Sequence, residues 1–160
     1  MNRVSVAGAP GPPPAWARRA GAFARRVLGR LGRDGWELSV LVCGEGEMAG
    51  LNSRFRGREG PTDVLSFSQE EGQAFPRGPA RRLRGDIAIC PGQMRANAAR
   101  LGVGEDEELR RLIVHGILHL DGMDHGEGEW DGPMLRLQER VLADLAGERV
   151  LPSGRAGGEA

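Results

Sequence analysis

The sequence predicts an α+β fold, in which helices pack against a small mixed sheet of four strands. Three observations favour this class. Four short segments with the apolar or alternating pattern of strands lie in the first 90 of the 160 residues. A helical pattern joins the first two of them, whereas the last two are joined by a loop that suggests a hairpin. Only helical patterns follow, which is typical of α+β proteins.

The four expected strands are residues 2–7, 36–43, 62–67 and 84–90. In the first, Val4 and Val6 alternate with polar or small residues, and the second is apolar and rich in β-branched side chains. The third and fourth read TDVLSF and RGDIAIC. We expect these two to pair across the loop at residues 68–82, which is rich in Gly, Pro, Gln and charged residues.

Five segments have a helical pattern: residues 15–31, 45–54, 91–101, 105–121, and a last helix that Asp131 would cap. Apolar residues recur on one face of the first helix: Trp16, Ala20, Phe23, Val27 and Leu31. Pro91 suits the first turn of the third helix. The last helix carries an apolar stripe: Met134, Leu137, Val141 and Leu145.

The length of 160 residues suits one domain with a proper core. We expect that domain to span residues 1–147 and residues 148–160 to form a flexible tail. No stretch of 18 apolar residues predicts a membrane span, and the N-terminus lacks the apolar run of a signal peptide. The expected location is therefore the cytoplasm. Two cysteines do not make a disulfide scaffold.

All 22 basic residues are arginine, and they balance 22 acidic residues, so the formal net charge is zero. Six arginines fall in and just after the first helix: Arg18, Arg19, Arg25, Arg26, Arg30 and Arg33. Such a run is more often a solvated helix face than a nucleic-acid patch. The neutral total gives no overall attraction to RNA.

All three histidines lie in the segment HGILHLDGMDH, at His115, His119 and His125. Residues four apart on a helix lie about 6 Å apart along one face, so the first two can bind one ion. Gly122 can then end this buried helix and let the chain fold back with His125. Three imidazole ligands leave one tetrahedral position open, as in catalytic zinc sites. An ion held this way lowers the pKa of bound water to about 7.

Several alternatives stay open for this site. Imidazole ligands suit nickel, copper and iron as well as zinc, and zinc is our expectation. A structural metal is possible if Cys43 or Cys90 supplies a fourth ligand. The H-x-x-x-H-x-x-G-x-x-H spacing is also that of metzincin proteases, which carry a glutamate base after the first histidine. Gly116 stands there in this chain, which argues against peptide hydrolysis by that mechanism.

Two carboxylates near the histidines could accept a proton from the second nitrogen of a ligand imidazole, namely Asp121 and Asp124. Helix capping and turn formation explain both residues almost as well. Thr62, Asp63 and Ser66 could line a cleft, although hydrogen bonding at the strand end is the simpler role.

Three motifs occur in one order: LNSRFRGREGPTDVLSF at residues 51–67, GDIAICP at residues 85–91, and the histidine segment. Together they resemble the YbeY family, the bacterial endoribonucleases of rRNA maturation. The resemblance implies a single-strand-specific, metal-dependent endoribonuclease that matures the 3′ end of 16S rRNA and acts in ribosome quality control. It also implies rRNA, the small ribosomal subunit and assembly factors as partners.

The resemblance places the family's metal ligands on His115, His119 and His125, and its important arginine on Arg56. A planar guanidinium binds phosphate oxygens in a fork, which suits phosphodiester cleavage. Two other functions remain alternatives. One is a metal-dependent protease or other hydrolase, and the other is a non-catalytic ribosome-assembly factor whose metal orders the fold.

Overall fold

The computed structural model describes residues 1–68, 84–126 and 131–152. Four strands form one sheet: β1 (Arg3–Ala9), β2 (Glu37–Cys43), β3 (Val64–Ser68) and β4 (Arg84–Ile89). Their order is β1-β2-β4-β3, with β1, β2 and β4 parallel and β3 antiparallel to β4 at one edge. The predicted mixed sheet and the pairing of its last two strands are confirmed.

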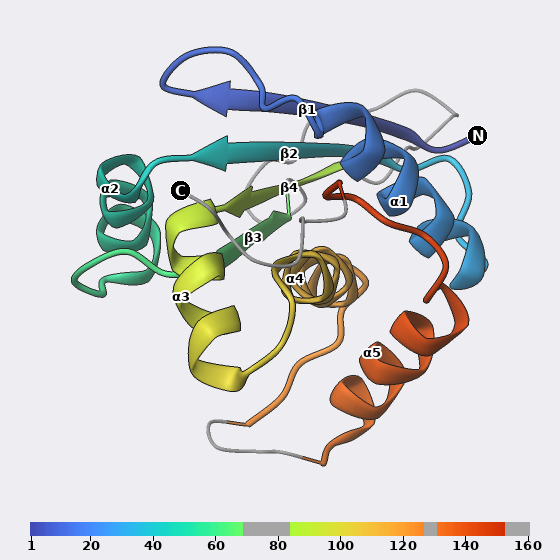
Figure 1. Ribbon diagram of the computed structural model, residues 1–160. Coiled ribbons are helices and arrows are strands. Elements are labelled where there is room, and N and C mark those ends of the chain that lie inside the picture. The colour runs from blue at the N-terminus through green and yellow to red at the C-terminus, as the bar shows by residue number, and fades with distance from the viewer. Residues whose placement is uncertain (69–83, 127–130, 153–160) are drawn as a thin grey trace.

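Five helices accompany the sheet: α1 (Ala17–Arg30), α2 (Glu45–Arg56), α3 (Pro91–Leu101), α4 (Glu105–Leu120) and α5 (Pro133–Asp144). Helix α4 contacts the sheet through β3 and β4 and also contacts α1, α3 and α5. Figure 1 shows α4 beneath the sheet, with α5 on its outer side and α2 at one end of the sheet. The α+β class is therefore confirmed, and α4 is its central helix.

The main core lies between α4 and one face of the sheet. Leu109, Ile113 and Ile117 of α4 are fully buried, and so are Ile87 and Ile89 of β4. Side chains alternate between the two faces of a strand, so Glu37 and Ser39 of β2 and Asp86 of β4 lie on the other face. This packing holds α4 rigidly against the sheet.

A smaller core lies on the opposite face of the sheet, where α2 covers one end. It contains Cys43, Met48, Leu65, Ala88 and Cys90. Both cysteines are buried and free. Burial raises the pKa of Cys43 to about 11, so this residue is a neutral thiol at physiological pH.

Two details differ from the sequence-based expectations. Helix α5 begins at Pro133 with Gly132 as its N-cap, because proline suits the first helical turn. Asp131 does not cap it, and its side chain instead accepts a hydrogen bond from Arg136 Nη1 at 3.3 Å. The expected loop at residues 68–82 begins one residue later than predicted, since Ser68 belongs to β3, and its remainder lies outside the described residues.

The chain after α5 returns to the start of α4. The backbone N–H groups of Val150 and Leu151 donate to Asp106 Oδ1 at 2.8 and 2.7 Å, and Val150 is fully buried. The chain is therefore anchored at Val150, inside the segment whose composition suggested a tail. Residues 153–160 lie outside the described part of the chain.

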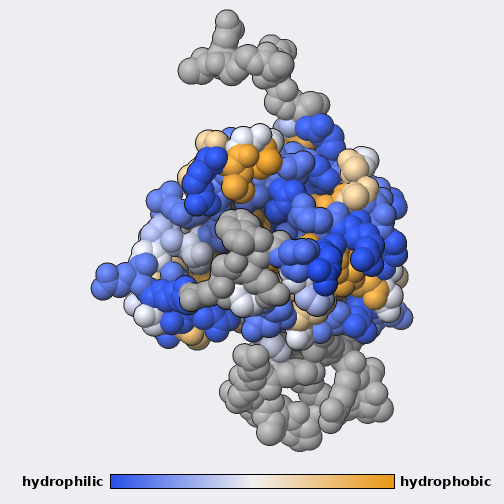
Figure 2. Space-filling model, turned by 90° about the horizontal axis from the view of Figure 1, so that it is seen from below, coloured by the Kyte–Doolittle hydropathy of each residue, from blue (hydrophilic) through white to orange (hydrophobic). Residues whose placement is uncertain are grey.

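The face of the molecule seen from below in Figure 2 is mainly hydrophilic, and its hydrophobic residues form small separate patches. Among the helices of the described residues, none is both long enough and apolar enough to span a membrane.

Candidate active site

The structure brings the three histidines together at the end of α4. His115 and His119 lie one helical turn apart, and their Nε2 atoms are 3.0 Å apart. Gly122 then adopts a φ of 90°, which favours glycine, and the chain turns back to His125. One ligand nitrogen from each ring lies within 4.8 Å of the other two. The three histidines form a cluster that can hold a metal ion.

Each imidazole has an oxygen acceptor at its second nitrogen. His115 Nδ1 lies 2.7 Å from Gln138 Oε1, His119 Nδ1 lies 3.1 Å from the Met123 carbonyl oxygen, and His125 Nδ1 lies 3.2 Å from the Gly126 carbonyl oxygen. An oxygen of this kind only accepts, so each Nδ1 carries the proton. All three Nε2 atoms therefore keep a free lone pair.

The convergence of these lone pairs is the observation that fits a cation. His115 Nε2 and His119 Nε2 face each other at 3.0 Å, and with both protons on Nδ1 neither can donate to the other. Two lone pairs at that distance repel, whereas a metal ion placed between them would accept both. Burial lowers the pKa of both residues below the ordinary 6.5, which favours the neutral, ligating form.

Gln138 of α5 is the polar partner of His115 that sequence reasoning missed. Its amide is 6% exposed, and its Nε2 donates to Glu139 Oε2 at 3.2 Å, which orients Oε1 toward the histidine. Arg111 of α4 holds Glu139 through two hydrogen bonds of 3.0 and 2.9 Å and keeps the pKa of that carboxyl below its usual range. One feature of the sequence could have revealed Gln138: it is a polar residue four positions after Met134, on the apolar face of the last helix.

The hypothesis that Asp121 orients an imidazole is wrong, because its carboxylate pairs with Arg33 at 2.9 Å. Asp124 lies closer to the site. Its Oδ1 is 4.0 Å from His119 Nδ1 and accepts the backbone N–H of His125 at 2.8 Å. Its direct role is therefore to order the turn that carries the third histidine.

A cleft of about 740 Å³ opens beside the cluster. His115 and His119 line it from α4, and Asp63 and Ser66 line it from the β3 side. The Asp63 carboxylate is held by the Val64 N–H at 2.7 Å and by Asn97 Nδ2 at 2.8 Å. Asp63 and Ser66 therefore line the cleft, whereas Thr62 is not among its lining residues. Asp63 also makes a hydrogen bond at the strand end, which was the simpler role expected of it.

Arg56, the last residue of α2, reaches this cleft across the edge of the sheet. Its Nη2 donates to the Ser66 carbonyl oxygen at 2.6 Å, and its Cζ lies 5.2 Å from the centre of the Phe67 ring. These contacts hold an exposed guanidinium beside the histidines. The neighbouring Arg58 lines the same cleft.

A family model described as Endoribonuclease YbeY matches residues 16–146. The chain belongs to the YbeY family. Endoribonuclease YbeY of Treponema pallidum is 40% identical over 154 residues, which cover 96% of this chain and 95% of that protein. Its counterpart in Salinispora tropica is 41% identical over 137 residues, covering 80% and 87%.

A solved structure agrees with this assignment to the YbeY family. The solution structure of TM1509 from Thermotoga maritima superposes with a TM-score of 0.58 at 26% identity, covering 92% of this chain and 91% of that one. The family resemblance inferred from the three sequence motifs is confirmed.

The position after the first histidine separates this YbeY-family site from that of metzincin proteases. Gly116 faces the sheet, and a Cβ atom there would lie 2.8 Å from Ile87 Cδ1. A glutamate at this position would point into the core and away from the cleft. Nor does either cysteine belong to the ligand cluster, as judged over the described residues. The structure therefore does not support a metzincin-like protease site or a structural metal site with a cysteine ligand.

Proposed function

We propose that this chain is a metal-dependent endoribonuclease that cleaves single-stranded RNA in the maturation of the 3′ end of 16S rRNA. We also assign it to ribosome quality control in the cytoplasm, with the small ribosomal subunit and its assembly factors as partners. The observation that carries the proposal is the gathering of one ligand nitrogen from each of three imidazoles, two of which line a cleft that Arg56 also lines. The endoribonuclease names of the relatives support it.

His115, His119 and His125 would hold one zinc ion through Nε2. The lowered pKa values of His115 and His119 and the acceptors at the three Nδ1 atoms suit this role, because a ligand imidazole must offer a lone pair in a defined direction. When bound, a zinc ion supplies a Lewis acid that polarises water or a phosphoryl oxygen. His115 and His119 line the cleft, where substrate would enter.

Arg56 would hold the scissile phosphate. Cleavage of a phosphodiester builds negative charge on the phosphate oxygens, and a guanidinium fixed in advance stabilises that charge without reorganising. One of its five N–H groups donates to the Ser66 carbonyl oxygen, so the others can serve a phosphate. The side chain is therefore oriented and yet keeps donors for substrate.

The test uses purified protein whose metal content has been measured, incubated separately with single-stranded RNA, double-stranded RNA and casein. We expect cleavage of single-stranded RNA alone. A His119→Ala variant is assayed in parallel and should lose both metal and cleavage. Persistent RNA cleavage in that variant would indicate a contaminating nuclease and would favour a non-catalytic assembly role, and cleavage of casein would favour a protease.

A further inference from the structure

We propose that Phe55, backed by Phe67 and flanked by Arg54, is a stacking platform for one nucleobase of single-stranded RNA next to the scissile phosphate. This inference rests on the proposed function, since it names how the same site would select an unpaired strand. The ligand is an unpaired nucleotide, recognised through its π face and its phosphate.

The exposure of Phe55 is the first observation. Its side chain is 51% exposed at the end of α2, whereas Phe23 and Trp36 are 2% and 6% exposed in the core. Across the described part of the chain, no other aromatic residue is exposed to this degree. An aromatic ring that folding leaves in water is available for contact with a ligand.

The ring is also held in place. Phe55 packs edge-to-face against Phe67 of β3, with ring centroids 5.2 Å apart and an interplanar angle of 64°. The Cζ atom of Arg54 lies 5.8 Å from the Phe55 centroid, within the range of a cation–π contact. A ring fixed in this way loses little conformational entropy when a base stacks on it.

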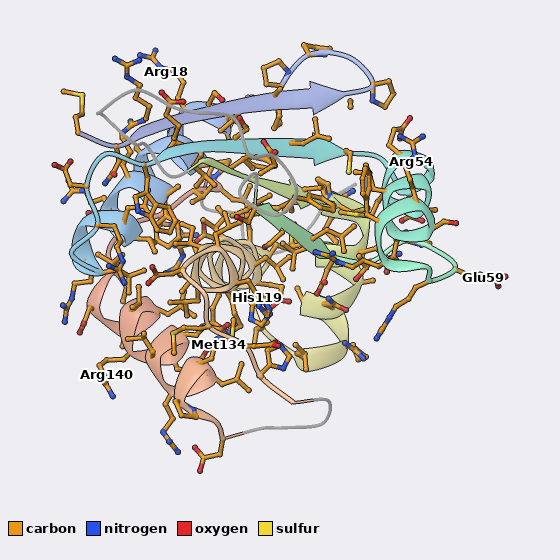
Figure 3. All side chains as sticks on the ribbon, turned by 180° about the vertical axis from the view of Figure 1, so that it is seen from behind. Arg18, Arg54, Glu59, His119, Met134 and Arg140 are labelled. Atoms are coloured by element: carbon orange, nitrogen blue, oxygen red, sulfur yellow. The ribbon has the colours of Figure 1, made fainter. Side chains whose placement is uncertain are left out.

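The platform is continuous with the cleft. Phe67 contacts Phe55 on one side and lies under the guanidinium of Arg56, which lines the cleft beside His115 and His119. An RNA strand whose phosphate is bound by Arg56 would therefore place an adjacent nucleotide over α2. Figure 3 shows Arg54 on α2 at one end of the sheet and His119 on α4 below the sheet.

The charge of this surface favours RNA over a protein partner. Arg54, Arg56 and Arg58 lie within five residues around Phe55 and Gly57, at the end of α2, although the whole chain has no net charge. Aromatic rings interleaved with arginine are typical of proteins that bind single strands, because every base offers a π face and every nucleotide a phosphate. A base inside a duplex is already stacked on its neighbours and offers no free face, so the platform would select unpaired RNA.

The test is a double-mutant cycle, in which a change in the protein is combined with removal of a base from the substrate. All measurements use the metal-loaded full-length protein. Oligoribonucleotides that lack one base at a time, with the phosphates intact, are compared as substrates. We expect loss of one base near the cleavage site to lower kcat/KM by about 5- to 150-fold. Phe55→Ala should lower kcat/KM for the intact substrate by the same factor. Removal of that base should then cause no further decrease in this variant.

Three further variants serve as controls for this cycle. Phe55→Trp keeps a stacking face and should lose far less activity than Phe55→Ala does. Phe55→Leu keeps contact with Phe67 and should lower kcat/KM as Phe55→Ala does. It replaces the alanine variant if that variant does not fold. Leu101→Ala removes another exposed apolar side chain, 55% exposed at the end of α3, and should leave the kinetics unchanged.

A binding readout separates the platform from the nuclease. Oligonucleotides that carry 2-aminopurine at one position each are mixed with the protein, and one of them should lose fluorescence with the parent chain and not with Phe55→Ala. If the parent cleaves RNA while Phe55→Ala has unchanged kinetics, the platform is wrong and the endoribonuclease stands. If Phe55→Ala lowers activity equally for every abasic substrate, Phe55 only supports the fold, and the platform is again wrong. Fluorescence loss without cleavage by the parent would support the platform and reject the proposed function.

Discussion

Gln138 Oε1 lies 2.7 Å from His115 Nδ1, so a side chain of α5 determines which nitrogen of an α4 histidine faces the cleft. Gln138 is in turn linked through Glu139 to Arg111, which returns the network to α4. Two helices that are separate in sequence therefore orient one imidazole together. Such partners of ligand histidines fix the tautomer and the direction of the lone pair.

We expect Gln138→Leu to lower metal affinity by about 10- to 100-fold, because His115 loses the acceptor that fixes its ring. Gln138→Glu keeps an acceptor at this position and should restore most of the affinity. Competition with a chromophoric chelator measures both constants directly. Parental affinity in Gln138→Leu would show that this amide contributes packing alone.

Arg56→Ala should lower kcat/KM for single-stranded RNA by about 10²- to 10³-fold, the usual effect of removing a group that stabilises transition-state charge. Metal content should be unchanged, since Arg56 is not one of the three clustered ligands and its guanidinium is held by Ser66 and Phe67. Arg56→Lys should rescue little, because an ammonium lacks the planar fork. Arg140→Ala, at an exposed site on α5 labelled in Figure 3, is the matched control. Full activity in Arg56→Ala would remove this residue from the mechanism.

The metal-free protein should lose stability as the pH falls below about 6.5. Burial lowers the pKa of His115 and His119 from 6.5, so the unfolded chain binds these protons at a higher pH than the folded chain does. Between the unfolded and folded pKa values the unfolded state therefore carries more protons, and the free energy of unfolding falls with falling pH. Below the folded pKa values this loss is complete.

Urea unfolding of the chelated protein at a series of pH values measures this effect. Histidine is the side chain that ordinarily titrates between about pH 5 and 8, and the prediction concerns His115 and His119. A variant with both His115→Ala and His119→Ala should show a much flatter profile. A parent chain whose stability rises on acidification through this range would contradict the lowered pKa values.

Gly116→Ala should destabilise the fold by about 1–3 kcal/mol, because its methyl group would overpack α4 against Ile87 of β4. Gly50→Ala is the matched control, since a Cβ atom there meets nothing within 4 Å and alanine favours the helix. Denaturant unfolding of the two variants gives the comparison. Equal stability of Gly116→Ala and the parent would mean that α4 does not pack this closely on the sheet.

Local patterns in the sequence predicted most of the fold. The limits of all four strands and of α1 to α4 were placed within two residues, because apolar periodicity and Gly or Pro signals act over a few neighbours. The N-cap of α5 was placed one residue too early, and the burial of Val150 was not predicted. The second depends on Asp106, which accepts the Val150 N–H from 44 residues away, and no local pattern encodes such a contact.

The candidate site follows the same division. The histidine cluster could be predicted because its members are neighbours on one helix and the turn after it. Arg56 came only from the family resemblance, since its approach to the histidines depends on the edge position of β3. Gln138 was missed because it lies 23 residues from His115 on another helix. The contact of Phe55 with Phe67 also required the packing of α2 on the sheet.

The central claim is that three imidazoles hold one ion that RNA cleavage requires. Its most direct test is to strip the protein of metal, add zinc back in measured steps, and follow both bound metal and cleavage of single-stranded RNA. We predict no cleavage without metal and a linear rise that saturates at about one ion per chain. Full cleavage by the stripped protein, or saturation of activity without metal bound at His115, His119 and His125, would contradict this account.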